Sequence, residues 1–260
     1  MPKLAANLSM LFTELEFMAR FKGAAEAGFK GVEYLFPYDF SAQKIKDELE
    51  RYGLTQVLFN LPAGDWMVGE RGIACLPERV EEFRKGVDQA ISYATVMGCT
   101  QVNCLSGIIP KGLSQQDAEK TLIKNLKYAA DKLELAGVRL VVEAINTQDM
   151  PGFCVNNTNQ ALRLIGEVGS KNIHYQYDIY HMQIMEGNIA RTLSDHLSTI
   201  GHVQLADNPG RHEPGTGELN YEFLFQHLDD IGYQGWVGCE YVPANGTEAG
   251  LGWLKEYNLV

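Results

Sequence analysis

LIKNLKYAADKLELAGVRLVVEA, residues 122–144, contains one complete repeat of the fold that this chain predicts. Its first part places apolar side chains at helical spacing, which predicts a helix over residues 122–136. Gly137 follows at the position where a left-handed residue commonly ends a helix. The remaining residues form an apolar run, which is typical of a parallel strand covered on both faces. The repeat is therefore a helix, a glycine and a strand that ends at the carboxylate of Glu143.

The same order recurs along the whole chain. Further helices are predicted over residues 17–27, 80–97 and 162–168, and each stops at a glycine (Gly28, Gly98 and Gly169). Strands are predicted over residues 4–8, 31–35, 54–60, 100–105, 138–144, 173–178, 202–206 and 236–241. Strands that alternate with helices form a parallel sheet with right-handed crossovers.

Two architectures fit such a sheet: an open, doubly wound sheet and a closed barrel. Eight repeats in 260 residues, with no break in composition, favour a single (β/α)8 TIM barrel over residues 1–260. The open sheet also lacks its usual marker, because no G-x-G-x-x-G follows the first strand. The long segment 61–77 follows the third strand, where a barrel projects a loop over its mouth.

Composition excludes several classes of function. A net charge of -11 argues against nucleic acid, because binding phosphate needs clustered Lys and Arg. No apolar run approaches the roughly 20 residues that cross a bilayer, so no membrane partner is expected. Asn7 and Ser9 interrupt the apolar N-terminus, unlike a signal peptide, and we expect a cytoplasmic protein. Five cysteines without a C-x-x-C pair fit reduced thiols.

Each of the last four predicted strands carries an oxygen donor at or near its end. The four donors are Glu143, Asp178, Gln204 and Glu240. Alone, each would more often be a helix cap, a loop residue or a polar core residue. Neighbouring strands of a barrel bring such positions together above the core, and buried carboxylates are costly unless paired or bound to a metal. Oxygen donors favour Mg²⁺ or Mn²⁺ over zinc, so the pattern predicts one divalent cation.

Other candidates lie in the loops after the strands. His181 could orient a ligand or the substrate, or it could cap a helix. The Gly- and Pro-rich segment 207–220 contains Arg211, which could clamp an anion or could belong to a solvated loop. Arg71 is a second candidate for the substrate's anionic group. Trp66 could cover the mouth of the barrel or anchor its own loop.

With these residues the chain resembles the xylose-isomerase-like barrels, the group that includes ketose 3-epimerases and related sugar isomerases. The resemblance covers essentially the whole chain. The motifs that carry it are LAANLSMLF (4–12), GVEYLFPYD (31–39), NLPAGDW (60–66), GERGIAC (69–75), QYDIYHMQ (176–183), ADNPGRHEPGTGELNY (206–221) and GWVGCEY (235–241). In epimerases of this group the seventh-strand ligand is commonly His, whereas Gln204 stands here. The resemblance implies a small-molecule substrate and is compatible with a homo-oligomer.

The resemblance also implies a reaction: interconversion of hydroxypyruvate and tartronate semialdehyde. The residues fit this chemistry, because a carbonyl shift needs a proton removed from one carbon and returned to its neighbour. Glu143 and Glu240 are the predicted catalytic groups. His181 and Arg211 are the predicted substrate-binding groups, with Arg211 preferred to Arg71 because the family pattern has a basic residue there.

Four alternatives remain open from the sequence. A related isomerase or epimerase could act on a four-carbon oxo-acid, such as 2-oxo-tetronate, or on a free ketose. A metal-dependent DNA-repair endonuclease would need more than the six histidines present and a basic surface. A metal-dependent oxygenase would need two His and one carboxylate, which the strand ends lack. A non-catalytic ligand-binding barrel would have no need of two flanking carboxylates.

Overall fold

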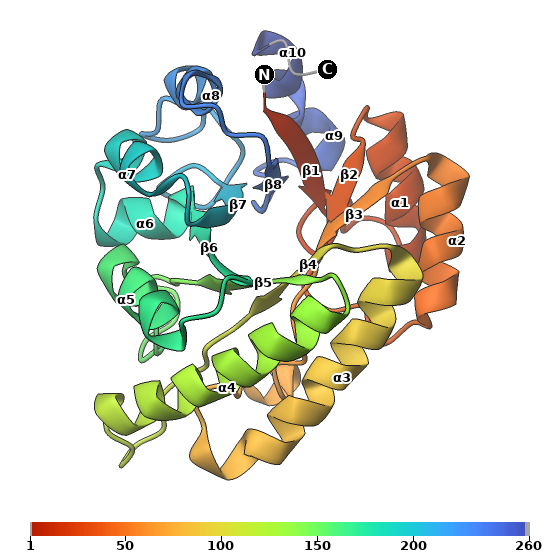
Figure 1. Ribbon diagram of the computed structural model, residues 1–260. Helices are drawn as coiled ribbons and strands as arrows, with labels where there is room; N and C mark the ends of the chain where they lie inside the picture. Colours follow the sequence, from red (N-terminus) through yellow and green to blue (C-terminus); the bar gives the residue numbers. More distant parts are fainter. Residues whose placement is uncertain (1, 258–260) are drawn as a thin grey trace.

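Eight parallel strands surround a common axis in the computed structural model, which describes residues 2–257 (Figure 1). The strands are β1 (Lys3–Asn7), β2 (Gly31–Glu33), β3 (Thr55–Leu58), β4 (Gln101–Cys104), β5 (Arg139–Glu143), β6 (Ile173–Asp178), β7 (Ile200–Leu205) and β8 (Trp236–Cys239). Their order is β3-β2-β1-β8-β7-β6-β5-β4. The gap between β3 and β4 is bridged where Asn60 pairs with Asn103 and Asn103 N donates to Phe59 O over 2.9 Å. The predicted TIM barrel is confirmed.

Helices form the outer ring of this barrel (Figure 1). They are α1 (Phe17–Glu26), α2 (Ala42–Tyr52), α3 (Val80–Met97), α4 (Gln115–Leu135), α5 (Thr158–Val168), α6 (Ile179–Met185), α7 (Ile189–His196), α8 (Tyr221–Asp230), α9 (Thr247–Gly250) and α10 (Gly252–Glu256), with short 3-10 turns η1 (Trp66–Val68) and η2 (Pro77–Arg79). Among the described residues, none of the helices combines the length and the apolar character that spanning a membrane requires.

The predicted strands and helices are all present, with small shifts at their ends. The prediction for β6 matches both of its bounds, and the prediction for α3 does so too. The largest difference is α4, which begins at Gln115, seven residues before the predicted start at residue 122. Its first two turns are mostly polar, so the apolar periodicity begins after the helix does. The start is set instead by Ser114, whose Oγ accepts a hydrogen bond from Asp117 N over 3.1 Å.

The glycines predicted to end helices all have positive φ, as the short return to the next strand requires. Gly98 after α3 and Gly169 after α5 adopt φ values of 67° and 68°, in the left-handed region that other residues avoid. Gly53 plays the same part after α2, a helix that the apolar pattern did not predict.

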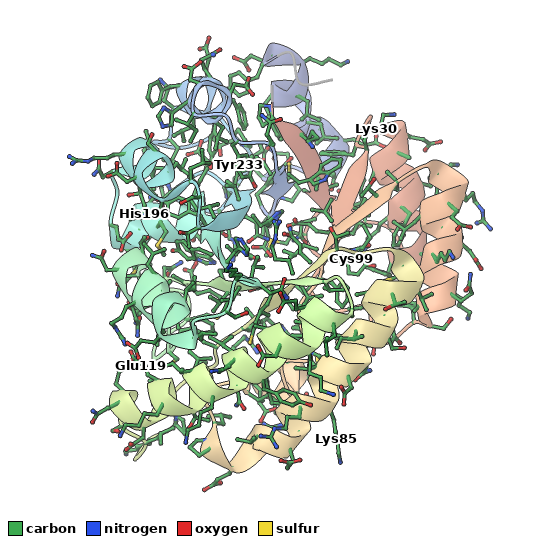
Figure 2. All side chains as sticks on the ribbon, in the orientation of Figure 1. Lys30, Lys85, Cys99, Glu119, His196 and Tyr233 are labelled. Atoms are coloured by element: carbon green, nitrogen blue, oxygen red, sulfur yellow. The ribbon has the colours of Figure 1, made fainter. Side chains whose placement is uncertain are left out.

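The interior of the barrel has an apolar floor and a polar upper layer. Ala5, Val57, Leu58 and Val141 pack with Trp236 to form the floor. Above it, the buried side chains near the carboxyl ends of the strands are polar or charged. Figure 2 shows how side chains fill the space that the ribbon encloses. The change from apolar to polar along the barrel axis is what places a chemical site at this end of the strands.

Candidate active site

The four predicted metal ligands come from the carboxyl ends of four consecutive strands. Glu143 ends β5, Asp178 ends β6, Gln204 lies in β7 opposite Asp178 in the strand register, and Glu240 follows β8. Their side chains are buried, with 1–5% of each residue exposed. The barrel therefore gathers all four residues at one end, as the strand pattern predicts.

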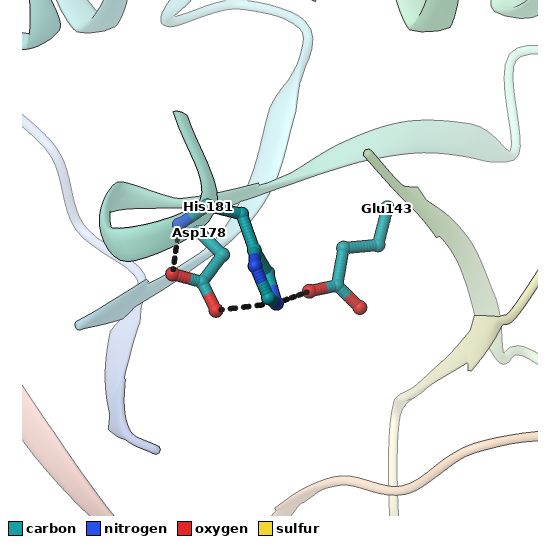
Figure 3. Close-up of side chains that lie close together, drawn as sticks. All are labelled: Glu143, Asp178 and His181. Atoms are coloured by element: carbon teal, nitrogen blue, oxygen red, sulfur yellow. Dashed lines mark hydrogen bonds and ion pairs between the residues drawn. The ribbon is translucent and has the colours of Figure 1, made fainter. Parts of the chain in front are cut away.

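Glu143, Asp178 and His181 form the tightest group, with one ligand atom from each within 4.8 Å of the others. His181 Nε2 lies 3.8 Å from Glu143 Oε1 and 3.7 Å from Asp178 Oδ2 (Figure 3). These two carboxylate oxygens are buried and have no hydrogen-bond partner among the described residues. Buried carboxylate oxygens without donors are the groups that a cation would satisfy.

Asp178 caps a helix, one of the two roles that the sequence left open, and keeps its second oxygen free of hydrogen-bond partners among the described residues. Its Oδ1 caps α6 by accepting hydrogen bonds from Tyr180 N at 2.8 Å and His181 N at 3.3 Å. Its Oδ2 points away from the helix toward His181 Nε2. The cap fixes the side chain and leaves one oxygen directed into the site.

Arg211 brings a positive charge against two of these carboxylates. Its Nη2 lies 2.8 Å from Glu240 Oε2 and 3.8 Å from Asp178 Oδ2, and its guanidinium stands over the ring of Tyr180. Its Nε is buried without a partner among the described residues. The backbone of Arg211 has a φ of 57°, a left-handed conformation that costs a non-glycine residue about 1 kcal/mol or more.

The loop that carries Arg211 is built around Asp207, which is fully buried. Its carboxylate accepts hydrogen bonds from the backbone N–H groups of Asn208, Gly215, Gly217 and Leu219 at 2.9–3.1 Å. Segment 207–220 is thus a hydrogen-bonded loop that holds Arg211 over the barrel, while residues such as Pro209 and Thr216 on its outer side are exposed to solvent.

Burial and mutual repulsion govern the protonation of the carboxylates. Burial, followed by the charges of Glu240 and Asp178, raises the pKa of Glu143 well above its usual value. Burial also raises the pKa of Asp178, and it raises the pKa of Glu240 to about 8, in both cases against the lowering effect of Arg211. The three carboxylates are therefore not fully compensated by positive charge, and a bound divalent cation would reduce the repulsion between them.

His181 is a neutral imidazole in this setting, because burial and then the charge of Arg211 lower its pKa well below the usual value. Its Nδ1 lies 2.7 Å from Asn146 Nδ2. The Asn146 amide can face only this way, since its Oδ1 accepts from Gln148 N and Asp149 N. Nδ1 therefore accepts, and the single proton of the ring is on Nε2, which faces the carboxylates.

Glu143, His181, Arg211 and Glu240 line a small cavity of about 80 Å³ at the mouth of the barrel, whereas Asp178 and Gln204 are not among its lining residues. Its lining residues are Met10, Leu35, Asn60, Trp66, Leu105, Glu143, Ile145, Met150, Gln176, His181, Arg211 and Glu240. Within the described chain, Asn60 Nδ2, Glu143 Oε1, Gln176 Oε1 and Arg211 Nε are buried without a hydrogen-bond partner. Donors and acceptors that converge on a cavity of this size suit a small, highly oxygenated ligand.

Trp66 and Arg71, the two candidates in the long loop after β3, differ in their position relative to the cavity. Trp66 lines the cavity and packs against Phe36, with ring centroids 5.1 Å apart. Arg71 stacks on Trp66 at 4.0 Å and donates to the carbonyls of Trp66 and Glu70, but it does not line the cavity. Arg211, not Arg71, is therefore the guanidinium that lies beside the carboxylates.

Several polar residues of the site were not predicted. Asn7, Glu33, Asn103, Asn146, Gln176 and His202 are all buried and hydrogen-bonded to the predicted residues or to one another. A signal for them exists in the sequence, since most are polar residues within otherwise apolar strands. Such positions identify inward-facing groups only once the strand register is known.

The model of the xylose isomerase-like TIM barrel family matches residues 21–257. The chain belongs to this family. Hydroxypyruvate isomerase of Escherichia coli K12 is 52% identical over 257 residues, which cover 99% of this chain and 100% of that protein. The 2-oxo-tetronate isomerase of Cupriavidus necator is 46% identical and covers 99% of both chains. The expectation of an isomerase of the xylose isomerase-like family is thus confirmed.

Two solved structures share this fold. The crystal structure of AP endonuclease, family 2 from Brucella melitensis has 49% identity and a TM-score of 0.96, with 99% of each chain covered. The 3-keto-D-glucoside 4-epimerase YcjR of E. coli superimposes with a TM-score of 0.78 at 22% identity, over 98% of this chain and 100% of that chain. At that identity the second comparison concerns the xylose isomerase-like fold alone.

Proposed function

We propose that this protein interconverts hydroxypyruvate and tartronate semialdehyde with one divalent cation, Mg²⁺ or Mn²⁺, held by Glu143, Asp178, Gln204 and Glu240. The observation that carries the proposal is the pair of buried carboxylate oxygens, Glu143 Oε1 and Asp178 Oδ2, that have no donor among the described residues. They lie 3.8 Å and 3.7 Å from His181 Nε2, beside the small cavity that Glu143 and His181 line. The full-length similarity to a hydroxypyruvate isomerase supports the same conclusion.

The donor set fits a hard cation. Three carboxylates and the amide oxygen of Gln204 offer only oxygen, which Mg²⁺ and Mn²⁺ prefer. His181 lies close enough to belong to the set. However, its Nε2 carries the ring proton, because Asn146 occupies Nδ1, and a protonated nitrogen cannot bind a metal. We therefore assign His181 to the substrate.

The reaction moves one proton between neighbouring carbons. A carboxylate takes a proton from C3 of hydroxypyruvate, the carbon that bears the hydroxyl, and a proton is delivered to C2. The carbonyl forms at C3 as O3 loses its hydroxyl proton, and O2 gains a proton to become the new hydroxyl, so no proton is gained or lost overall. A bound divalent cation would stabilise the negative charge that develops on the two neighbouring oxygens. Glu143 on β5 and Glu240 after β8 are the groups proposed to remove and return the proton.

Hydrogen bonds orient the carboxylates of Glu143 and Glu240 for the proposed proton transfer. Glu143 Oε2 accepts from Asn103 Nδ2 at 3.1 Å, so its Oε1 is the free atom. Glu240 accepts from Asn7 Nδ2 at 3.2 Å and from Arg211 Nη2 at 2.8 Å. Glu143 is thus fixed through one oxygen and Glu240 through both. The pKa of Glu240, raised to about 8 by burial, suits a group that both accepts and donates a proton near neutral pH.

Arg211 and His181 are proposed to bind the substrate. The unpartnered Nε of Arg211 can donate to the substrate carboxylate. The Nε2–H of His181 can donate to the reacting oxygen at C2 or C3. Trp66 forms part of the cavity wall and is placed to exclude water.

A second substrate is favoured by a specific observation, the 46% identity to a 2-oxo-tetronate isomerase. Purified protein, freed of metal and supplied with Mn²⁺ or Mg²⁺, should be assayed with hydroxypyruvate, 2-oxo-tetronate and a free ketose. We expect the highest kcat/KM with hydroxypyruvate, because the cavity of about 80 Å³ corresponds to the volume of only a few water molecules. Higher kcat/KM with 2-oxo-tetronate would transfer the assignment to that substrate.

Other classes are tested in the same preparation. Cleavage of DNA at abasic sites is not expected from a chain with a net charge of -11. Tightly bound iron would contradict the proposed cation, and binding of hydroxypyruvate without turnover would contradict an enzyme. A cytoplasmic location and a homo-oligomer stay predictions.

A further inference from the structure

A fourth buried carboxylate, Glu33, lies among the predicted ligands although it is not one of them. It ends β2 and is fully buried. Its two oxygens accept hydrogen bonds from His202 Nε2 at 2.8 Å, Gln204 Nε2 at 2.8 Å and Asn7 Nδ2 at 3.1 Å. All three side chains donate to Glu33. Of these, Asn7 also donates to Glu240, and Gln204 is itself a proposed metal ligand.

Strand β8, which is separated from β2 by β1, leaves room for this carboxylate. A Cβ atom at Gly238 of β8 would lie 2.3 Å from Glu33 Oε1 and 2.4 Å from Oε2. Only a residue without a side chain therefore leaves room for Glu33 at this height in the barrel. The space is occupied by a charged group that touches neither the cavity nor solvent, which needs an explanation in terms of its partners.

The contact with Gln204 decides which end of that amide faces the site. A carboxylate only accepts, so Gln204 must direct its Nε2 at Glu33. Its Oε1 is then on the other side, where it accepts from Gln176 Nε2 at 2.6 Å. Oε1 is also the only atom of this side chain that can bind a cation. Turning the amide over would present nitrogen to the metal and oxygen to Glu33.

The contact between Glu33 and Asn7 also affects the position of Glu240. Asn7 Oδ1 accepts from Ser9 N at 3.1 Å, so its Nδ2 is the end that faces the barrel interior. That Nδ2 is shared between Glu33 Oε1 and Glu240 Oε1. His202 completes the arrangement, because its Nδ1 pairs with Gln101 Nε2 at 3.2 Å and its Nε2–H is left to donate to Glu33.

We propose that Glu33 is a positioning residue, which orients the amides of Gln204 and Asn7 so that Gln204 Oε1 and the carboxylate of Glu240 are presented to the cation. This inference rests on the proposed function, since it takes Gln204 as a ligand. It assigns Glu33 no contact with the substrate.

The test is a cycle of four proteins whose Mn²⁺ affinity is measured by calorimetric titration of the metal-free form. Glu33→Gln replaces one of the two acceptor oxygens with a donor, so the three present donors cannot all keep their hydrogen bonds, and we expect Mn²⁺ affinity to fall at least tenfold. In the double variant E33Q/Q204E the amide and the carboxylate exchange strands. The amide introduced on β2 can then donate to the carboxylate introduced on β7, which still presents an oxygen to the site. Affinity should therefore recover to within about fivefold of wild type.

The single variant Gln204→Glu separates orientation from simple charge. If Glu33 acts only through its negative charge, Q204E has one carboxylate more than the double variant and should bind Mn²⁺ more tightly than it. If Glu33 acts as an acceptor for residue 204, two carboxylates face each other in Q204E, and the double variant should bind more tightly than either single variant. His202→Gln is the matched control, because its amide retains a donor toward Glu33 and its affinity should stay within threefold of wild type.

Each outcome decides something. No Mn²⁺ binding by the wild type would overturn the proposed function itself. Wild-type affinity in E33Q, or a double variant no tighter than Q204E, would overturn the role of Glu33 and leave the metal site standing. If E33Q does not fold, as judged by its thermal transition, the comparison of the double variant with Q204E alone still gives the answer.

Discussion

Asn146 Nδ2 lies 2.7 Å from His181 Nδ1, and this contact determines which nitrogen of the imidazole carries its proton. Asn146 comes from the loop after β5 and His181 from α6, so the relationship joins two successive strand–helix connections. The backbone N–H groups of Gln148 and Asp149 hold the Asn146 oxygen. The consequence is a hydrogen-bond donor, His181 Nε2–H, aimed at the space between Glu143 and Asp178.

Replacing this amide with a carboxylate should reverse the tautomer. In Asn146→Asp the side chain accepts from Nδ1, the ring proton moves there, and Nε2 can no longer donate to the substrate. We expect kcat/KM to fall about 100-fold, the usual effect of losing one donor to developing charge. Nitrogen chemical shifts of His181 should report the exchanged tautomer. An active variant with the proton on Nδ1 would remove the His181 donor from the mechanism.

The two proposed proton-transfer groups are tested by removing only their charge. Glu143→Gln and Glu240→Gln should each lower turnover about 10³-fold, within the range expected for loss of general acid–base catalysis. Circular dichroism should show an unchanged fold. Asn103, which donates to Glu143, provides a milder companion variant, and Asn103→Ala should retain much of the activity. Near-wild-type turnover in either Glu variant would exclude that residue from proton transfer.

The two candidate arginines form a natural pair for comparison. Arg211→Ala should raise KM for the substrate by about 10-fold or more, because a hydrogen bond to a charged group contributes about 1.5–3 kcal/mol. Arg71→Ala should change KM much less, since Arg71 stacks on Trp66 and does not line the cavity. Steady-state kinetics of both variants measure this directly. A larger effect on KM from Arg71 would reverse the assignment.

The pH dependence of stability follows from the raised carboxylate pKa values. Burial raises the pKa of Glu143 and Asp178 and brings that of Glu240 to about 8. Between the unfolded pKa of a carboxylate, about 4, and these folded values, the native metal-free protein binds more protons than the unfolded chain. The contribution of these groups is therefore favourable at low pH and is lost as pH rises toward about 8.

Metal binding should offset the loss of stability at higher pH. We expect the thermal midpoint of the metal-free protein to decrease from about pH 5.5 to about pH 8.5, and the increase in midpoint on adding Mn²⁺ to be larger at the higher pH, where the ligands are deprotonated. The variant E240Q should show a shallower decrease in the metal-free state. A Mn²⁺ effect that is larger at the lower pH would contradict carboxylate ligation.

Much of the fold could be predicted because each repeat carries its own local signals. The apolar run before Glu143, the glycine at position 137 and the periodicity of residues 122–136 mark one strand, one turn and one helix without any long-range information. Helix α2 was missed because most of its residues are polar and only Ile45 and Leu49 are buried. Short helices such as α6 and α9 offer too few turns for a period to emerge.

Some residues of the site could likewise be predicted from local patterns, and others could not. Glu143 and Asp178 could be predicted because parallel strands end at the same edge of a barrel. The roles of Glu33 and His202 could not, since their hydrogen bond joins residues 169 positions apart and depends on closure of the barrel. The choice between Arg71 and Arg211 depended on the course of two loops, which is set by contacts such as those of Asp207 rather than by any local pattern.

The proposed function depends on one divalent cation that is shared by the ends of β5, β6, β7 and β8. An anomalous difference map from a crystal of the protein grown with Mn²⁺ tests it most directly. We expect a single strong peak within about 2.5 Å of oxygens from Glu143, Asp178, Gln204 and Glu240, with His181 Nε2 outside the coordination sphere. A peak bound by His181 in place of Gln204, or no peak at this end of the barrel, would contradict it.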